Sequence, residues 1–454
     1  MNKEKIHNQS VQALLLLLIL NFDSVNCQIK EQIKTNEKIA SEIKKNLDND
    51  FSLWYPLCID TAYGGFFSDI NYKWQLEGTQ NKMIVSQARH IWSTSNAFLF
   101  FSNGPELIQT AEHGFKFLRD VMWDKEFGGF YDLVNREGKP LPEAGQIIKK
   151  AYGNSFAIYG LAAFYKATGN KQALELAKKT FYWLEKFSHD KQHGGYFQFL
   201  SRNGNVHQSR FQHYPPKDQN SSIHLLECFT ELYKVWPDSL LGDRLISLLR
   251  IIRDTITHQD GYMRLFFSRD WNPISYRDSF PEVRNKNYEI DHVSSGHDIE
   301  TAYLMLEASE LINAEDHLLT LSKAKKMVDH TIKFGWDNEL GGIYDGGYYF
   351  NNEKEPRIIK STKEWWAQAE ALNSLLLMST IYPNEKKYSE YFYKQWEYIK
   401  KYMIDSKFGG WYWGGIDQVP ENKFASKGSI WKVNYHTSRS LINCLRLINE
   451  RTDN

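Results

Sequence analysis

The stretch DKEFGGFYD, from Asp124 to Asp132, decides the fold because the chain repeats it. An aspartate, a glycine pair and aromatic residues recur in DTAYGGFFSD, DKQHGGYFQF, DNELGGIYDG and DSKFGGWYWG, which begin at Asp60, Asp190, Asp337 and Asp405. A weaker copy, QDGYMRLFF, has only one glycine, Gly261. The six phrases recur at intervals of about 65 to 80 residues, and such a period indicates a repeat architecture.

Each phrase closes an amphipathic helix. In PELIQTAEHGFKFLRDVMWD, apolar residues three and four positions apart form one face: Leu107, Ala111, Phe115, Leu118 and Met122. Glycine supplies the positive φ angles that a helix exit and a tight turn require, and the aromatic residues after it favour a short strand. Each phrase therefore predicts a helix end, a turn and a strand.

A second helix follows each phrase by roughly two dozen residues. Segments such as YGNSFAIYGLAAFYKATG and WWAQAEALNSLLLMSTI are apolar almost all round, so we expect burial on most sides. Six outer and six inner helices, alternating, predict an all-α fold: a closed six-hairpin (α/α)6 barrel with short β-strands on one rim. An open solenoid is the alternative, but neither end carries a polar capping repeat.

Polar and aromatic residues gather where the inner helices begin. They are Arg89, Trp92, Tyr152, Asn154, Asn220, His224, His297, Glu300, Trp365, Trp366, Glu370, Trp431, His436 and Arg439. Parallel inner helices bring these starts to one mouth, where free N–H groups favour anions. Any one of these residues alone could belong to the core, but their recurrence in every repeat predicts a shared pocket.

A metal site is not expected. In HDIE, His297 and Glu300 share a helix face, which would suit a metal ion. Helical di-metal sites need a second such pair with further carboxylates, and the sequence offers none.

Composition narrows the function. The 454 residues hold 55 Lys plus Arg and 55 Asp plus Glu, so the chain lacks the basic excess of a nucleic-acid binder. Aromatic residues make up 15%, which suits a large helical core and equally a site that stacks on sugars.

The N-terminus predicts export. Lys3 and Lys5 precede an apolar run, Val11–Leu20, that is too short to span a bilayer and fits a secretory signal. We expect residues 1–27 to be a signal peptide, residues 28–454 to form a single catalytic domain, and the mature protein to be periplasmic or secreted. A lipid anchor at Cys27 is the alternative.

Three further cysteines, Cys58, Cys228 and Cys444, lack metal-ligand spacing and are expected to be buried thiols.

The fourth repeat is longer than the others. Its extra segment, RDWNPISYRDSFPEVRNKNYEIDHVSS, leads into His297. We interpret it as a loop over the pocket mouth, with a surface decoration as the alternative.

Several motifs together resemble the N-acylglucosamine 2-epimerase superfamily, and within it the cellobiose 2-epimerases, including mannobiose-acting members. They are SGHDIETAYLMLEA, KEWWAQAEAL, NSSIHLLECFTELYKVWPD and WKVNYHTSR, and the resemblance runs from about Trp54 to Leu447. It implies a six-hairpin barrel without a cofactor, a disaccharide substrate, no membrane span, and a monomer or weak dimer. The implied reaction interconverts glucose and mannose at the reducing end of a β-1,4-linked disaccharide.

The resemblance also implies roles for single residues. The essential arginine falls on Arg89, and the paired acid/base histidines fall on His297 and His436. The remaining positions would bind substrate or support the site: Asn220, His224, Glu300, Trp366, Glu370 and Trp431. Tyr152, at the start of an inner helix, is also expected to bind substrate.

The chemistry suits these residue types. Removing the C2 proton of an open-chain aldose gives a cis-enediolate, and a histidine near neutral pKa is a suitable base. A fixed guanidinium stabilises the enediolate oxygen.

Other functions stay open at this point. The same chemistry serves an aldose–ketose isomerase of the mannose type or an N-acylglucosamine 2-epimerase. A glycoside hydrolase would need two carboxylates, with Asp298, Glu300 and Glu370 as candidates. A non-catalytic sugar-binding protein would not need the histidines.

Overall fold

A computed structural model describes residues 34–452, except residues 103, 208–210, 212 and 352. The predicted signal peptide, residues 1–27, lies outside this part. Within it, no helix has the length and apolar character needed to cross a membrane.

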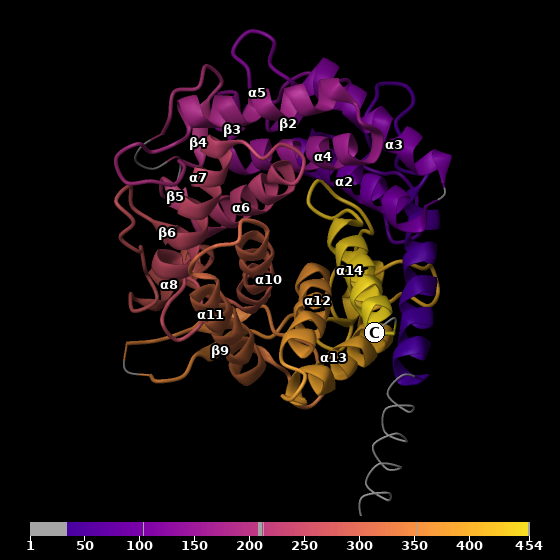
Figure 1. The fold of residues 1–454 in the computed structure, drawn as a ribbon, viewed down its shortest axis with the longest axis vertical. Coiled ribbons are helices and arrows are strands. Elements are labelled where there is room, and N and C mark those ends of the chain that lie inside the picture. Colours follow the sequence, from indigo (N-terminus) through magenta and orange to yellow (C-terminus); the bar gives the residue numbers. More distant parts are fainter. Residues whose placement is uncertain (1–33, 103, 208–210, 212, 352, 453–454) are drawn as a thin grey trace, which may run out of the picture.

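The helices form two concentric rings (Figure 1). The inner ring consists of α2 (Ile84–Phe101), α4 (Ala151–Thr168), α6 (Gln219–Tyr233), α10 (Ser295–Leu311), α12 (Trp365–Ile381) and α14 (Tyr435–Thr452). Each of these helices contacts the next, and α14 contacts α2, so the chain closes on itself instead of forming an open solenoid. The prediction of a mostly helical ring is confirmed.

The outer helices pack one apolar face against this inner ring. They are a helix at residues 34–54 and α3 (Pro105–Phe117), α5 (Lys171–Phe187), α7 (Ser239–Arg250), α11 (His317–His330) and α13 (Lys387–Tyr398). Four of them pass into a single π-helical turn before the glycine phrase: Leu118–Met122, Ile251–Ile256, Thr331–Gly335 and Ile399–Met403. Cys58, Cys228 and Cys444 are buried, as expected.

Short antiparallel strands join neighbouring repeats. The pairs are β1 (Lys82–Met83) with β2 (Leu133–Val134), β3 (Ile148–Lys150) with β4 (Phe199–Ser201), and β5 (Lys217–Asp218) with β6 (Phe266–Phe267); β8 (Gly346–Tyr348) lies between β7 (Val293–Ser294) and β9 (Arg357–Lys360). The first strand of each pair precedes an inner helix, and its partner follows the next glycine turn. The extra segment of the fourth repeat folds in part into α8 (Pro281–Lys286) and α9 (Tyr288–Asp291).

The glycine pairs do supply positive φ angles. Gly128 has φ 68° and Gly129 has φ 71°, and the other four pairs are alike. A Cβ atom on Gly129 would lie 2.7 Å from the Trp183 ring, so an aromatic side chain packs directly on the turn.

The aspartate that opens each phrase holds the turn to the next inner helix. Asp124 Oδ1 accepts hydrogen bonds from the N–H groups of Glu126 and Phe127, while Oδ2 lies 3.0 Å from the buried ammonium of Lys149. Lys149 also donates to the Gly128 carbonyl and stands in β3, directly before α4. One buried cation therefore ties the exit of an outer helix to the entry of the following inner helix.

All five strong copies of the phrase share this lysine–aspartate pair. The pairs are Lys82–Asp60, Lys149–Asp124, Lys217–Asp190, Lys363–Asp337 and Lys427–Asp405. In the fourth repeat, Val293 takes the strand position of the lysine and packs with Tyr262 and Tyr349. An apolar contact replaces the ion pair where the phrase is weak.

Replacing Lys427 with methionine should lower the free energy of unfolding by about 3 to 5 kcal/mol, because it leaves a buried carboxylate uncompensated. Among the described residues, Lys427 is the cation paired with Asp405, and both side chains are 1% exposed. Urea denaturation measures the change.

Lys44→Met is the matched control, because Lys44 pairs with Asp48 on the surface with both side chains about half exposed. That variant should lose less than about 1 kcal/mol. Equal losses in the two variants would contradict the role given to the buried pairs.

Candidate active site

A cavity of about 410 Å³ opens at the end of the helical ring where the inner helices begin. It takes Arg89 from α2, Tyr152 from α4, and His297 and Glu300 from α10. The other predicted residues that line it are Asn220, His224, Trp366, Trp431 and His436. Of the ten residues to which the sequence gave site roles, Glu370 alone does not line the cavity.

Arg89 is a buried cation aimed at this space. Its guanidinium is sandwiched between the rings of Phe156 and Tyr435, 4.4 and 4.8 Å from their centroids. It donates to the hydroxyl of Tyr152 and to the backbone carbonyl of Trp431, each at 3.3 Å. No carboxylate among the described residues forms an ion pair with it, so its charge is available to an anionic ligand.

The side chain of Glu370, beneath the cavity, holds His436 in place. Its Nδ1 lies 2.7 Å from Glu370 Oε1, and Glu370 is fully buried beneath the cavity. Since Nδ1 is engaged, Nε2 is the nitrogen left for a ligand. Glu370 therefore positions His436 and lies out of reach of a bound sugar.

His224 is held in the same way by a residue that the sequence did not single out. Its Nδ1 lies 2.8 Å from Oε2 of Glu227, three residues later on α6. Glu227 also accepts hydrogen bonds from Tyr435 and Arg439. The signal was present, since HLLE places a histidine and a glutamate at the same spacing as HDIE.

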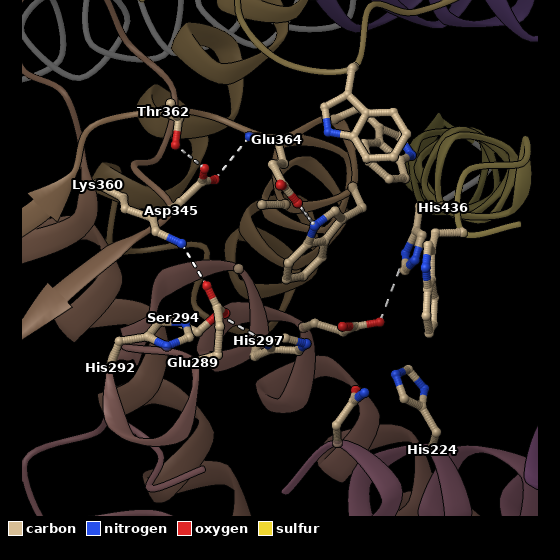
Figure 2. Close-up of a pocket in the computed structure, with 18 of the residues that line it drawn as sticks. His224, Glu289, His292, Ser294, His297, Asp345, Lys360, Thr362, Glu364 and His436 are labelled. Atoms are coloured by element: carbon tan, nitrogen blue, oxygen red, sulfur yellow. Dashed lines mark hydrogen bonds and ion pairs between the residues drawn. The ribbon is translucent and has the colours of Figure 1, made fainter. Parts of the chain in front are cut away.

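His297 differs from the other two histidines. Its Nδ1 lies 2.8 Å from the hydroxyl of Ser294, and its ring packs on Trp366 with centroids 4.6 Å apart. The Trp366 indole N–H donates to Glu364 at 2.6 Å, which fixes the ring. Figure 2 shows His224, His297 and His436 facing one space.

Arg439 joins the carboxylates under the cavity. It forms ion pairs with Glu227, with Glu300 at 2.5 Å and with Glu370 at 2.7 Å. Ligand atoms of Glu300, Glu370 and His436 lie within 4.8 Å of one another, close enough to hold a metal ion. The guanidinium already neutralises these carboxylates, so the cation position belongs to Arg439.

Two of the three histidines are held neutral. Burial lowers the pKa of His297 to about 3, assisted by His224 and His292. Burial also lowers the pKa of His436 well below its usual value, with Arg89 and Arg439 adding to the effect. Both are therefore unprotonated at neutral pH, and burial is the main cause.

The extra segment of the fourth repeat forms part of the cavity wall. Tyr288, Glu289 and His292 line the cavity beside the β9 region (Figure 2). Glu289 forms an ion pair with Lys360 at 2.6 Å, which joins this segment to β9. The segment is therefore more than a surface decoration.

Three residues near the helix starts have structural roles. Trp92 stacks on Tyr159 with centroids 5.2 Å apart. The side chains of Asn154 and Asp298 accept the backbone N–H groups of glycine turns, those of Phe130 and Met263. Asp298 lies outside the cavity, as does Glu370, which leaves a hydrolase without two facing carboxylates from the proposed set.

Comparison with known proteins identifies the family of the chain. Residues 65–439 match the N-acylglucosamine 2-epimerase (GlcNAc 2-epimerase) family. The chain is 30% identical over 422 residues to a cellobiose 2-epimerase of Ruminococcus albus, covering 91% of this chain and 100% of that protein.

Solved structures share the fold. That of cellobiose 2-epimerase from Spirochaeta thermophila has a TM-score of 0.79 at 28% identity, covering 92% of this chain and 98% of the other. A D-mannose isomerase structure has a TM-score of 0.76 at 22% identity, covering 89% of this chain and 97% of the other.

The family match and these relatives together show that the protein is an isomerase of the carbohydrate epimerase class. The chain belongs to the N-acylglucosamine 2-epimerase family, as its motifs predicted.

Excess chelator should leave turnover unchanged, because the Arg439 guanidinium already pairs with Glu300 and Glu370, two of the three residues that a metal ion would need. The measurement is initial rate before and after dialysis against EDTA. A loss of rate that a divalent ion restores would contradict this assignment.

Proposed function

We propose that the protein is a sugar 2-epimerase that interconverts glucose and mannose at the reducing end of a β-1,4-linked disaccharide, of the cellobiose or mannobiose type. The observation that carries the proposal is a buried guanidinium, Arg89, with no carboxylate partner among the described residues, facing two neutral histidines. A stored positive charge beside two bases suits a reaction that passes through an anion.

The histidines divide the proton transfers at C2. His436 removes the C2 proton of the open-chain sugar, since Glu370 at Nδ1 can stabilise the imidazolium that forms. Arg89 stabilises the oxygen of the cis-enediolate. His297, which gains a proton from the O1 hydroxyl when the sugar ring opens, then returns a proton to C2 on the opposite face.

The cavity walls favour a disaccharide. Trp366 packs on His297 and offers a flat face to the reacting sugar, while Trp413 and the half-exposed Trp431 line the wall farther out. Aromatic faces stack on the C–H faces of sugars, so the outer pair provides a second subsite.

The fold is inferred to be a six-hairpin (α/α)6 barrel. Two observations support this assignment: the inner helices contact one another in a closed cycle, and an outer helix lies beside each of them.

Export to the periplasm or medium, with cleavage near Cys27, remains a proposal from the first 27 residues. The N-terminal residue of the mature protein tests it, and a lipidated Cys27 would favour the anchored alternative. A monomer or weak dimer is the corresponding proposal for the assembly.

The central experiment incubates the protein in D2O with cellobiose, mannobiose, mannose and N-acetylglucosamine, followed by NMR. We expect a C2 epimer of a disaccharide that carries deuterium at C2. Fructose or a ketose end would favour the aldose–ketose isomerase, and N-acetylmannosamine would favour the N-acylglucosamine 2-epimerase.

His436→Asn is the matched variant for this experiment. It should reduce deuterium incorporation at C2 by about 10²-fold or more, because a general base contributes typically 10²- to 10⁴-fold. Incorporation at the wild-type rate would show that another group is the base.

A further inference from the structure

His224 and His436 sit in matching carboxylate dyads. Each offers Nδ1 to a buried glutamate, at 2.8 Å for Glu227 and 2.7 Å for Glu370, and each lines the cavity. Both glutamates bind the same guanidinium, that of Arg439. His224 is therefore built like the proposed base rather than like an ordinary sugar-binding side chain.

The two dyads differ in charge. Burial raises the pKa of Glu227, but Arg439 and His224 outweigh burial and lower it to about 2, so this carboxylate is an anion. Burial raises the pKa of Glu370 above its usual value, and the neighbouring Glu300 adds to the effect. His224 faces a full negative charge, whereas the raised pKa of Glu370 weakens the negative charge that faces His436.

The other neighbours of His224 leave this arrangement in place. Its ring lies 5.3 Å from that of Tyr152 and 4.8 Å from that of Phe156, both on α4. Charged and titratable groups from three helices lie near it or near its partner: Glu227 and Asp218 around α6, Arg439, Tyr435 and His436 on α14, and His297 on α10. An anion at Nδ1 stabilises an imidazolium, whose Nε2–H can then be donated into the cavity.

We propose that His224 is a third proton-transfer residue and that, as an acid held by Glu227 and Arg439, it opens the sugar ring. The inference rests on the proposed function, because an epimerase of this kind must first convert a cyclic hemiacetal into an aldehyde. It assigns Glu227 and Arg439 as positioning residues.

The step balances in protons and electrons. The His224 imidazolium gives its Nε2 proton to the ring oxygen O5, while neutral His297 takes the proton of the O1 hydroxyl. The C1–O5 bond breaks with its electron pair going to O5, and the O1–H pair forms the C1=O1 double bond. The proton that His436 took from C2 passes through solvent to His297, and ring closure then runs the same transfers backwards, so no net proton is consumed.

The test separates ring opening from chemistry at C2. Freshly dissolved α-anomer of the substrate is mixed with enzyme, and the approach to anomeric equilibrium is followed by NMR beside C2 exchange in D2O. Wild-type enzyme should accelerate both. His224→Gln should lose about 10²-fold or more of the anomer acceleration and of kcat, while His436→Asn should keep the anomer acceleration and lose C2 exchange.

Two further variants control for structure. Glu227→Gln keeps the size of the side chain but removes the charge, so it should lower kcat and anomer acceleration together with little change in KM. It gives the same test if His224→Gln does not fold. His213→Gln, at an exposed histidine outside the cavity, should behave as wild type.

The results distinguish the proposed role of His224 from the proposed epimerase function. Folded His224→Gln or Glu227→Gln protein that accelerates anomer exchange at the wild-type rate would overturn the inference and leave the epimerase assignment standing. If the wild-type enzyme yields no C2 epimer from any sugar, the proposed function fails, and the anomer assay then reports on ring opening separately.

Discussion

The lysine–aspartate pair buried at each strong glycine turn is the constraint on which the structure depends. A carboxylate such as Asp124 both caps its own turn and binds the lysine that precedes the next inner helix. A buried ion pair is costly unless both partners stay in place, so each of the five pairs fixes the start of the inner helix that follows it. Because the inner helices run in parallel, these fixed starts meet at one mouth, and that is where the cavity lies.

A second buried charge, that of Arg439, orients the histidines that the fixed helix starts bring to the cavity. Arg439 forms ion pairs with Glu227, Glu300 and Glu370. Of these, Glu227 also contacts His224, and Glu370 also contacts His436. A single guanidinium thus sets the orientation of two imidazole rings contributed by helices some 200 residues apart in the chain. Arg89, which has no such partner among the described residues, keeps its charge for the substrate.

The sequence was sufficient for the helical ring and for nine of the ten predicted site residues, which line the cavity. The glycine period located the turns, and counting from them located Arg89, His297 and His436. It could not show that Glu370 lies beneath the cavity, because the direction of a side chain near a helix start depends on packing against the neighbouring helix. Glu227 was missed although HLLE has the spacing of HDIE, because its ion pair with Arg439, from another repeat, exists only once the helices are packed together.

The central claim is that a proton leaves C2 and is replaced from the protein or solvent. Turnover of a disaccharide deuterated at C2 of its reducing-end sugar tests this most directly. We expect slower turnover than with unlabelled sugar and a product that has lost deuterium to solvent, since histidine-bound protons exchange with water. A product that retains all of its deuterium, formed at the unlabelled rate, would contradict the account.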